Sequence, residues 1–203
     1  TLGTDTTNTV TLNKATLTVT GTVSPSKTYD GTTSATITGG TLNGVQGSDV
    51  VTLTQSGVYS SAAAGSGISI TMSNSVSGTN VSTNYLFTQP VVTGSISRAA
   101  LGVSAEATYA SSTSVTPSSA TLTGLVAADS AATVTNLVLS NANVGSGLYA
   151  TGLTLSNGAQ ANYVLNGASN TTLGTDTTNT VTLNKATLTV TGTVSPSKTY
   201  DGT

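Results

Sequence analysis

Apolar and polar residues alternate along short stretches of the chain. In ATLTVT at 15–20, Ala15, Leu17 and Val19 fall on one face of an extended strand, because successive side chains point to opposite faces. The same alternation predicts further strands at 9–13, 51–54, 68–72, 133–140 and 148–155. Turn-forming runs separate them at 38–40, 46–49, 77–80 and 156–162. No stretch has the spacing of an amphipathic helix, so the pattern predicts an all-β fold.

The alternation changes phase at two basic residues. Val10 and Leu12 occupy even positions before Lys14, whereas the apolar residues of 15–20 occupy odd ones. The same change occurs around Arg98, between VVTGSIS at 91–97 and AALGV at 99–103. One extended segment could therefore place side chains in one core and then, after the basic residue, in the next core. The alternative is two strands separated by a bulge or a tight turn.

An identical repeat relates the two ends of the chain. The run at positions 1–32 recurs without a change at positions 172–203. Folding constraints do not preserve so long an identity, because exposed positions of a strand tolerate many side chains. We interpret the chain as a window of a longer array whose repeating unit is the segment 1–171, cut at ends that are not natural termini.

A weaker repeat lies within the unit. KATLTV at 14–19 matches RAALGV at 98–103, and TYDGTTS at 28–34 matches TYASSTS at 108–114. Further matches link the Gly-rich, Asp-containing and Asn-Tyr segments in the same order and at nearly constant offsets. The predicted modules are module A at 14–98 and module B at 99–185. The final strand of a preceding module is predicted at 1–13, and the start of the next module A at 186–203.

Small β-sandwich-like modules in an elongated tandem array explain these features best, because strands and turn signals recur without helices. A β-grasp-like module is the alternative and requires one helix, with 60–67 as its best location. A parallel β-helix ranks third, since no coil period of about 20–30 residues appears. Stacking of neighbours would add stability to modules that each bury only a modest core.

Composition excludes several classes of site. Charged residues make up 6% of the chain and aromatic residues 4%, and there is no Cys, His or Trp. Nucleophile–base pairs and imidazole or thiolate metal ligands are therefore missing. A net charge of −2 gives no reason to expect nucleic acid as a partner, and no apolar run is long enough to insert into a membrane.

Carboxylates are the remaining candidates for chemistry, and they occur singly, at Asp5, Asp30, Asp49, Glu106 and Asp129. Glycoside chemistry needs a pair, and calcium needs several oxygen ligands in one loop. We therefore predict no enzyme activity, no catalytic residue, no metal site and no cofactor. Asp49 and Asp129, in the equivalent loops 47–49 and 127–129, are each expected to bond to nearby backbone amides.

Lysines at the predicted joints raise the possibility of an isopeptide staple to an Asn. Lys14 and Lys185 occupy equivalent joints, but Arg98 stands at the third and cannot form such a bond. We expect these side chains to face solvent.

Tyrosines and one turn recur at fixed module positions. Tyr29, Tyr85, Tyr109 and Tyr163 are expected to pack with their hydroxyl groups bonded at strand edges rather than to stack on ligands. The run KTYDGT at 27–32 is expected to be a tight turn, because Asp-Gly tolerates positive φ, with Lys27 in solvent.

The run NKATLTVTGTVSPSKTYDGTTSAT at 13–36, followed by AGSGISI at 64–70 and TNYLFTQPVVTGSISRA at 83–99, resembles YDG-type (MBG-like) repeats. These belong to large bacterial surface adhesins of the filamentous-haemagglutinin type. Residues 99–185 resemble a diverged copy that lacks Asp-Gly after Tyr109.

The resemblance implies an extracellular, cell-surface location and a stalk or fibre role without catalytic residues. The expected function is a structural segment of an adhesin or biofilm matrix that sets reach and stiffness, with a glycan- or ligand-binding module as the alternative. Expected partners are neighbouring modules of the same chain, laterally bundled copies, and glycans or host surfaces contacted through other domains.

Overall fold

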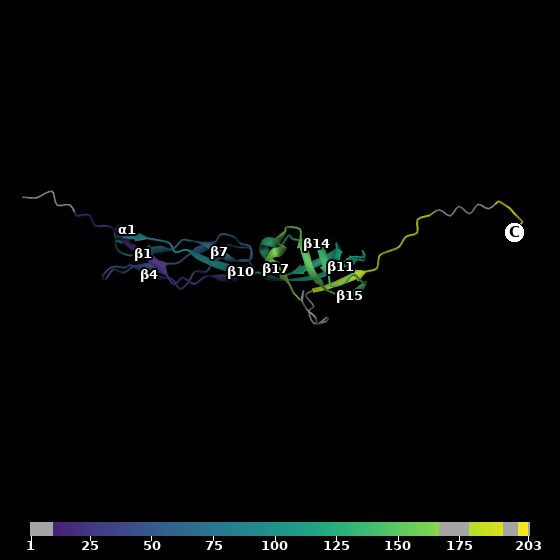
Figure 1. Cartoon of the computed structure of the whole chain (residues 1–203), viewed down its shortest axis with the longest axis horizontal. Coiled ribbons are helices and arrows are strands. Elements are labelled where there is room, and N and C mark those ends of the chain that lie inside the picture. The colour runs from purple at the N-terminus through teal and green to yellow at the C-terminus, as the bar shows by residue number, and fades with distance from the viewer. Residues whose placement is uncertain (1–9, 167–178, 193–198, 203) are drawn as a thin grey trace, which may run out of the picture.

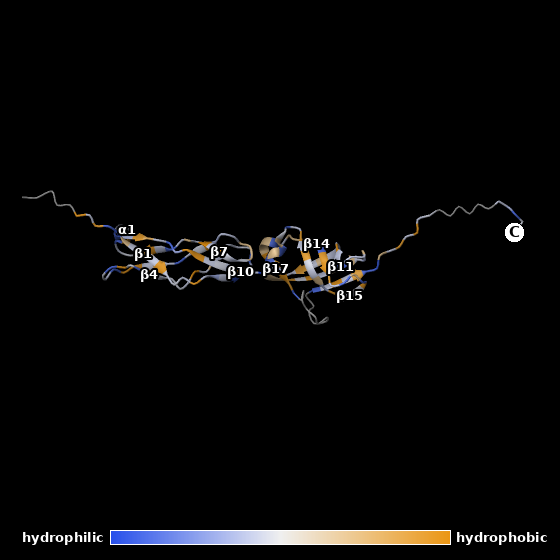
Figure 2. Cartoon of the chain, viewed as in Figure 1, coloured by the Kyte–Doolittle hydropathy of each residue, from blue (hydrophilic) through white to orange (hydrophobic). Residues whose placement is uncertain are grey.

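The computed structural model describes residues 10–166, 179–192 and 199–202. Two β-rich halves lie end to end, giving an elongated molecule (Figure 1). The first half comprises residues 15–97 and the second half residues 99–184. Hydrophobic residues are distributed over the strands of both halves (Figure 2), and strands such as 15–20 and 92–97 alternate buried and less buried positions. No helix among the described residues is long and apolar enough to cross a membrane.

Ten short strands and one helical turn build the first half. They are β1 (Ala15–Thr20), β2 (Ser26–Thr28), β3 (Ser34–Ala35), β4 (Thr41–Asn43), β5 (Thr52–Thr54), β6 (Gly57–Tyr59), β7 (Gly65–Met72), β8 (Ser75–Ser77), α1 (Val81–Asn84), β9 (Tyr85–Phe87) and β10 (Val92–Ser97). They form sheets in the orders β4-β1-β9, β2-β10-β7-β6-β3 and β5-β8.

The described residues of the second half form fewer, longer strands and two short 3-10 helices. They are β11 (Ala99–Thr108), β12 (Ser114–Val115), β13 (Pro117–Thr123), η1 (Ala127–Asp129), β14 (Val134–Leu139), β15 (Gly145–Leu148), β16 (Ala150–Leu155), η2 (Ala159–Asn162), β17 (Tyr163–Leu165) and β18 (Asn179–Asn184). Two sheets result, β13-β11-β18-β15 with β17 also on β11, and β12-β14-β16.

The all-β prediction is confirmed, and most predicted strands are present. β1 has the predicted bounds, and β5, β7, β14 and β16 lie within or across the predicted ranges. The helix that a β-grasp-like module requires near 60–67 is absent: β7 begins at Gly65, and no helix precedes it within the described part of the first half.

The two halves pair their strands in matching registers. β1 lies parallel to β9 with Ala15 opposite Tyr85, and β11 lies parallel to β17 with Ala99 opposite Tyr163. The parallel pair β2–β10 matches the pair formed by the end of β11 with β18, since Thr28 lies opposite Ser97. In the second half the corresponding partners are Thr108 and Asn184. The weak sequence repeat therefore corresponds to a repeated pairing pattern.

The phase change at Arg98 is confirmed. β10 buries Val92 and Ile96 on its even positions, and β11 buries odd positions beginning with Ala99 and Leu101. Only the exposed Arg98 separates the two strands. One cluster of buried residues crosses this joint, contributed by both halves: Tyr29, Tyr59, Ile70, Met72, Val92, Ile96, Ala99, Leu101, Leu155 and Tyr163.

The core of the second half lies between its two sheets. Its buried members come from β11, β18 and β15 on one side and from β12, β14 and β16 on the other: Val103, Ala105, Ala107, Val115, Leu137, Leu139, Leu148, Ala150, Val181 and Leu183. The far end of the first half has a much smaller cluster, of Leu17, Val81 and Tyr85.

The strand predicted at 9–13 is not formed over its described residues. Val10 and Leu12 are exposed, and residues 10–13 lie outside any strand. The identical sequence forms β18, where Val181 and Leu183 are fully buried. A strand needs neighbours to bond its backbone, and the described residues supply them only at the second location.

Candidate functional site

Tyr29 connects the two halves. It follows β2, and its backbone N–H donates to the Ser97 carbonyl at 2.8 Å, which fixes the residue beside the end of β10. Its side chain is buried, and its hydroxyl donates to Oδ2 of Asp129 at 3.0 Å. Its ring meets that of Tyr163 edge-on, with centroids 5.5 Å apart. One residue of the first half thus sits in a socket of the second half.

Asp129 forms the base of this socket. It ends η1 and is buried, and its Oδ2 also accepts the hydroxyl of Tyr163 at 2.7 Å. Its Oδ1 accepts from Nδ2 of Asn157 at 2.8 Å. Three donors satisfy the carboxylate, as burial of a charged group requires. The prediction that this side chain bonds to nearby backbone amides is wrong, because its partners come from distant parts of the chain.

Burial and the Asp129 carboxylate both raise the pKa values of Tyr29 and Tyr163. Burial, followed by the hydrogen bond to Asp129, raises the pKa of Tyr29 above its ordinary value. Burial is also the main reason why the pKa of Tyr163 is raised, to about 12. Both hydroxyl groups therefore keep their protons well above neutral pH and act as donors.

Close backbone packing surrounds the socket. The N–H of Ala64 in the first half donates to Oδ1 of Asn162 in the second at 2.9 Å. Gly31 has φ +76°, and a Cβ atom there would lie 2.6 Å from the Cβ of Ala128. Glycine at 31 is thus required both by the turn and by the close approach of the other half.

The KTYDGT turn is more tightly bonded than predicted. Oδ1 of Asp30 accepts from the backbone N–H and the hydroxyl of Thr32 and from Nζ of Lys27, at 2.8 to 2.9 Å. Lys27 also lies over the ring of Tyr59, 5.6 Å from its centroid. The bond from Lys27, with those from Thr32, lowers the pKa of Asp30 to about 2. The prediction of a solvated Lys27 is wrong, since turn and ring hold its ammonium group.

A second tyrosine–aspartate pair lies at the far end of the first half. The hydroxyl of Tyr85 donates to Oδ2 of Asp49 at 2.6 Å and accepts from the N–H of Gln46 at 2.9 Å. Tyr163 accepts the N–H of Val126 at 3.2 Å in the same way. The bond to Asp49 is the main reason why the pKa of Tyr85 is raised. Here too the predicted backbone-amide partner of the aspartate is wrong.

This second socket is open. A hollow of about 270 Å³ lies beside Asp49 and Tyr85, lined also by Lys14, Gln46 and Asn84 among others. Asp49 is exposed, in contrast to the buried Asp129.

Three of the four recurring tyrosines are buried with bonded hydroxyl groups, as predicted: Tyr29, Tyr85 and Tyr163. Tyr109 differs, because 40% of its surface is exposed and its hydroxyl accepts from the hydroxyl of Ser111. The prediction of a packed tyrosine therefore holds in both sockets and fails at Tyr109.

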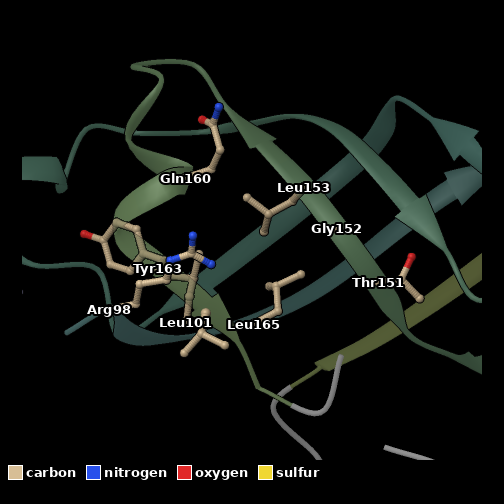
Figure 3. Close-up of a pocket in the computed structure, with 9 residues that line it drawn as sticks. Arg98, Leu101, Thr151, Gly152, Leu153, Gln160, Tyr163 and Leu165 are labelled. Carbon is tan, nitrogen blue, oxygen red and sulfur yellow. The ribbon is translucent and has the colours of Figure 1, made fainter. Parts of the chain in front are cut away.

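A hollow beside the joint is the candidate ligand pocket. It has a volume of about 270 Å³, and Arg98 and Gln160 are the long polar side chains that line it, beside the ring of Tyr163 (Figure 3). Leu101 and Leu165 line its apolar part together with Leu153. Its one aromatic residue, Tyr163, already donates its hydroxyl to Asp129. A sugar-binding face usually offers an exposed ring, so this pocket gives little support to the glycan-binding alternative.

The candidate carboxylates that the structure describes lie on different elements. Asp30, Asp49 and Glu106 are exposed and lie in a turn, a loop and β11 respectively. No three Asp or Glu side chains lie together among the described residues; Asp5 lies outside them.

The lysines at the joints face solvent, as expected. Lys14 is exposed and donates from Nζ to the Ser82 carbonyl at 2.7 Å. Lys185 is exposed as well.

Comparison with protein families supplies one match. Residues 13–93 match the YDG domain. The resemblance to a YDG-type repeat is thereby confirmed for the first half. The matched stretch runs from the residue before Lys14 into β10, so the YDG domain contains the Tyr29 turn and the Asp49–Tyr85 socket. Comparison with proteins of curated function gives no match, and neither does comparison with solved structures.

Proposed function

We propose that this chain is a structural stalk segment of a repetitive bacterial cell-surface or biofilm-matrix adhesin. In this proposal residues 14–98 and 99–185 are β-sandwich-like modules of a tandem array, exported to the cell exterior. Their role is to set the reach and stiffness of a fibre of filamentous-haemagglutinin-like type. Neither an enzyme activity nor a bound cofactor is part of the proposal.

The direct joint between the halves carries the proposal. β10 continues into β11 through Arg98 alone, so no flexible linker separates the two bodies. Hydrophobic residues of both halves share one buried cluster across the joint. Tyr29, bonded to Asp129, adds a buried polar contact next to it. Such an arrangement resists bending, which a stalk needs and a free ligand-binding module does not.

Internal repetition supports the array. The identical runs at 1–32 and 172–203 and the matching strand registers of the two halves indicate a unit that can be added repeatedly. A low charge content and many Ser and Thr residues give a hydrated surface with little electrostatic repulsion. Lateral bundling of such fibres is part of the proposal.

Small-angle X-ray scattering tests the stalk. We would compare this chain with a two-unit polypeptide in which the segment 1–171 precedes the full sequence. A stalk predicts that the added unit lengthens the particle along one axis, while the cross-section stays unchanged. A compact particle whose dimension grows only as the cube root of its mass would contradict the proposal.

A further inference from the structure

The open socket at the far end of the first half has the composition of the occupied one. We propose that the socket of Asp49 and Tyr85 binds Tyr109 of a preceding copy of residues 99–185 in the same polypeptide. The inference rests on the proposed tandem array and names the contact that joins one repeating unit to the next. The observed contact of Tyr29 with the second half is its template.

The two sockets correspond position by position. Asp49, Tyr85 and Gln46 stand where the second half has Asp129, Tyr163 and Val126, and the same hydrogen bonds connect them. Asn84 stands where Asn162 accepts the N–H of Ala64 across the joint. Lys14 takes the place of Arg98. The hollow at Asp49 and Tyr85 therefore lies where the second half receives a tyrosine ring.

The two tyrosines correspond as well. The N–H of Tyr29 donates to the carbonyl of Ser97 at 2.8 Å, and the N–H of Tyr109 donates to that of Asn184 at 2.9 Å. Ser97 is the last residue before Arg98, and Asn184 the last before Lys185. Tyr109 thus lies beside the C-terminal end of β18, as Tyr29 lies beside the C-terminal end of β10.

The sequence after β18 is the sequence that begins the first half. Residues 184–191 repeat residues 13–20, so the chain leaves β18 into the sequence of Lys14 and β1. A following copy of the first half would thus begin after Lys185, as the second half begins after Arg98. Its Asp49 and Tyr85 would lie at the level of Tyr109, whose side chain is exposed in the described structure.

The proposed contact differs from the Tyr29 contact in the residues where the turn meets the opposite loop. Ser111, with φ 56°, occupies the place of Gly31 in the turn, and Ser48 that of Ala128. A Cβ atom at position 31 would lie only 2.6 Å from the Cβ of Ala128. Two serines need ordinary van der Waals separation there, so the loop 46–49 must lie about 1 Å further from the turn than the loop 126–129 does.

A double-mutant cycle in the two-unit polypeptide tests this contact. At the junction, Tyr109→Phe is placed in the first unit and Asp49→Ala in the second, separately and together. Each single substitution is expected to lower the Tm by about 2–4 °C, and the double substitution is expected to lower it little further. Non-additivity follows because Tyr109→Phe removes the donor, and Asp49→Ala removes the acceptor, of the same hydrogen bond.

The matched control uses the same substitutions where no junction exists. Asp49→Ala in the first unit and Tyr109→Phe in the second change residues that have no such neighbour, and their effects are expected to be additive. Additive effects at the junction would overturn the inference. If scattering still showed an elongated particle in that case, the stalk proposal would stand alone. A compact two-unit particle would overturn the stalk, whereas coupling at the junction would still support the contact.

Discussion

The two halves share their strand registers but differ in how continuous their strands are. β11 is one ten-residue strand, whereas the first half has β1 and β2 with residues 21–25 between them. The matching registers leave one residue, Ala105, in place of those five. The inserted GTVSP contains a glycine of positive φ and a proline, which interrupt a strand.

The interruption divides the core. β11 contributes residues to both the joint cluster and the large cluster of the second half. In the first half, Leu17 of β1 belongs instead to a separate cluster with only two other buried members. The same pairing pattern therefore accompanies a large cluster of buried residues in the second half and a small one in the first, where residues 21–25 interrupt the strand.

Leucine truncation tests the difference between the cores most directly and has the largest expected effect. Leu17 and Leu101 occupy equivalent positions, and both are fully buried. We expect Leu101→Ala to lower the free energy of unfolding by about 4 kcal/mol and Leu17→Ala by about 2 kcal/mol, because the smaller cluster can collapse around the lost side chain. Urea denaturation followed by circular dichroism measures both. Equal losses would show that the two environments are equally filled.

Removal of the socket aspartates compares the occupied socket with the open one. Asp129→Ala leaves two buried tyrosine hydroxyl groups without an acceptor, so we expect a loss of about 3 kcal/mol. Asp49→Ala removes the acceptor of Tyr85 at an exposed site, and a loss of about 1 kcal/mol is expected. The same denaturation experiment applies. A larger effect at Asp49 than at Asp129 would contradict our assignment of the joint.

Exchange of the turn residues tests the close approach at the joint. Gly31→Ser introduces a side chain against Ala128 at positive φ, and a loss of about 2 kcal/mol is expected. Ser111→Gly relieves positive φ at a site without a neighbouring half, so a gain of up to about 1 kcal/mol is expected. Thermal unfolding of both variants gives the comparison. A neutral Gly31→Ser would mean that the halves separate easily.

Alkaline titration tests the burial of the Tyr163 hydroxyl, and its expected effect is the smallest because it concerns one ionisable group. The pKa of Tyr163 is raised to about 12, from an ordinary value near 10 in the unfolded chain. Stability from this group is therefore fully present below about pH 10 and is lost as pH rises through about 12. Absorbance of tyrosinate at 295 nm should show a late-titrating class of residues. Tyr163→Phe should remove one member of it, and an unchanged titration would contradict the burial.

Sequence reasoning predicted the recurrence of the socket residues but not their bonding. The matches of Asp49 to Asp129 and of Tyr85 to Tyr163 were visible as separate motifs. Nothing in their spacing showed that each aspartate binds a tyrosine far along the chain, since that pairing is set by how the loops fold back on the strands. The nearly equal offsets of the two motifs were the available signal. The contact of Tyr29 with Asp129 could not be predicted from the sequence, because the two residues lie in different halves of the molecule.

Alternation along the chain, by itself, determined which face of each segment turns inward. Leu17 and Val19 are buried in β1, and Val181 and Leu183 in β18, as the pattern requires. Whether a segment becomes a strand was decided by the tertiary structure. The sequence VTLN is exposed at 10–13 and forms part of β18 at 181–184, and ATLTVT is β1 at 15–20 but exposed at 186–191. The physical reason is that strand hydrogen bonds are made to neighbours, and identical sequences have different neighbours at the two places.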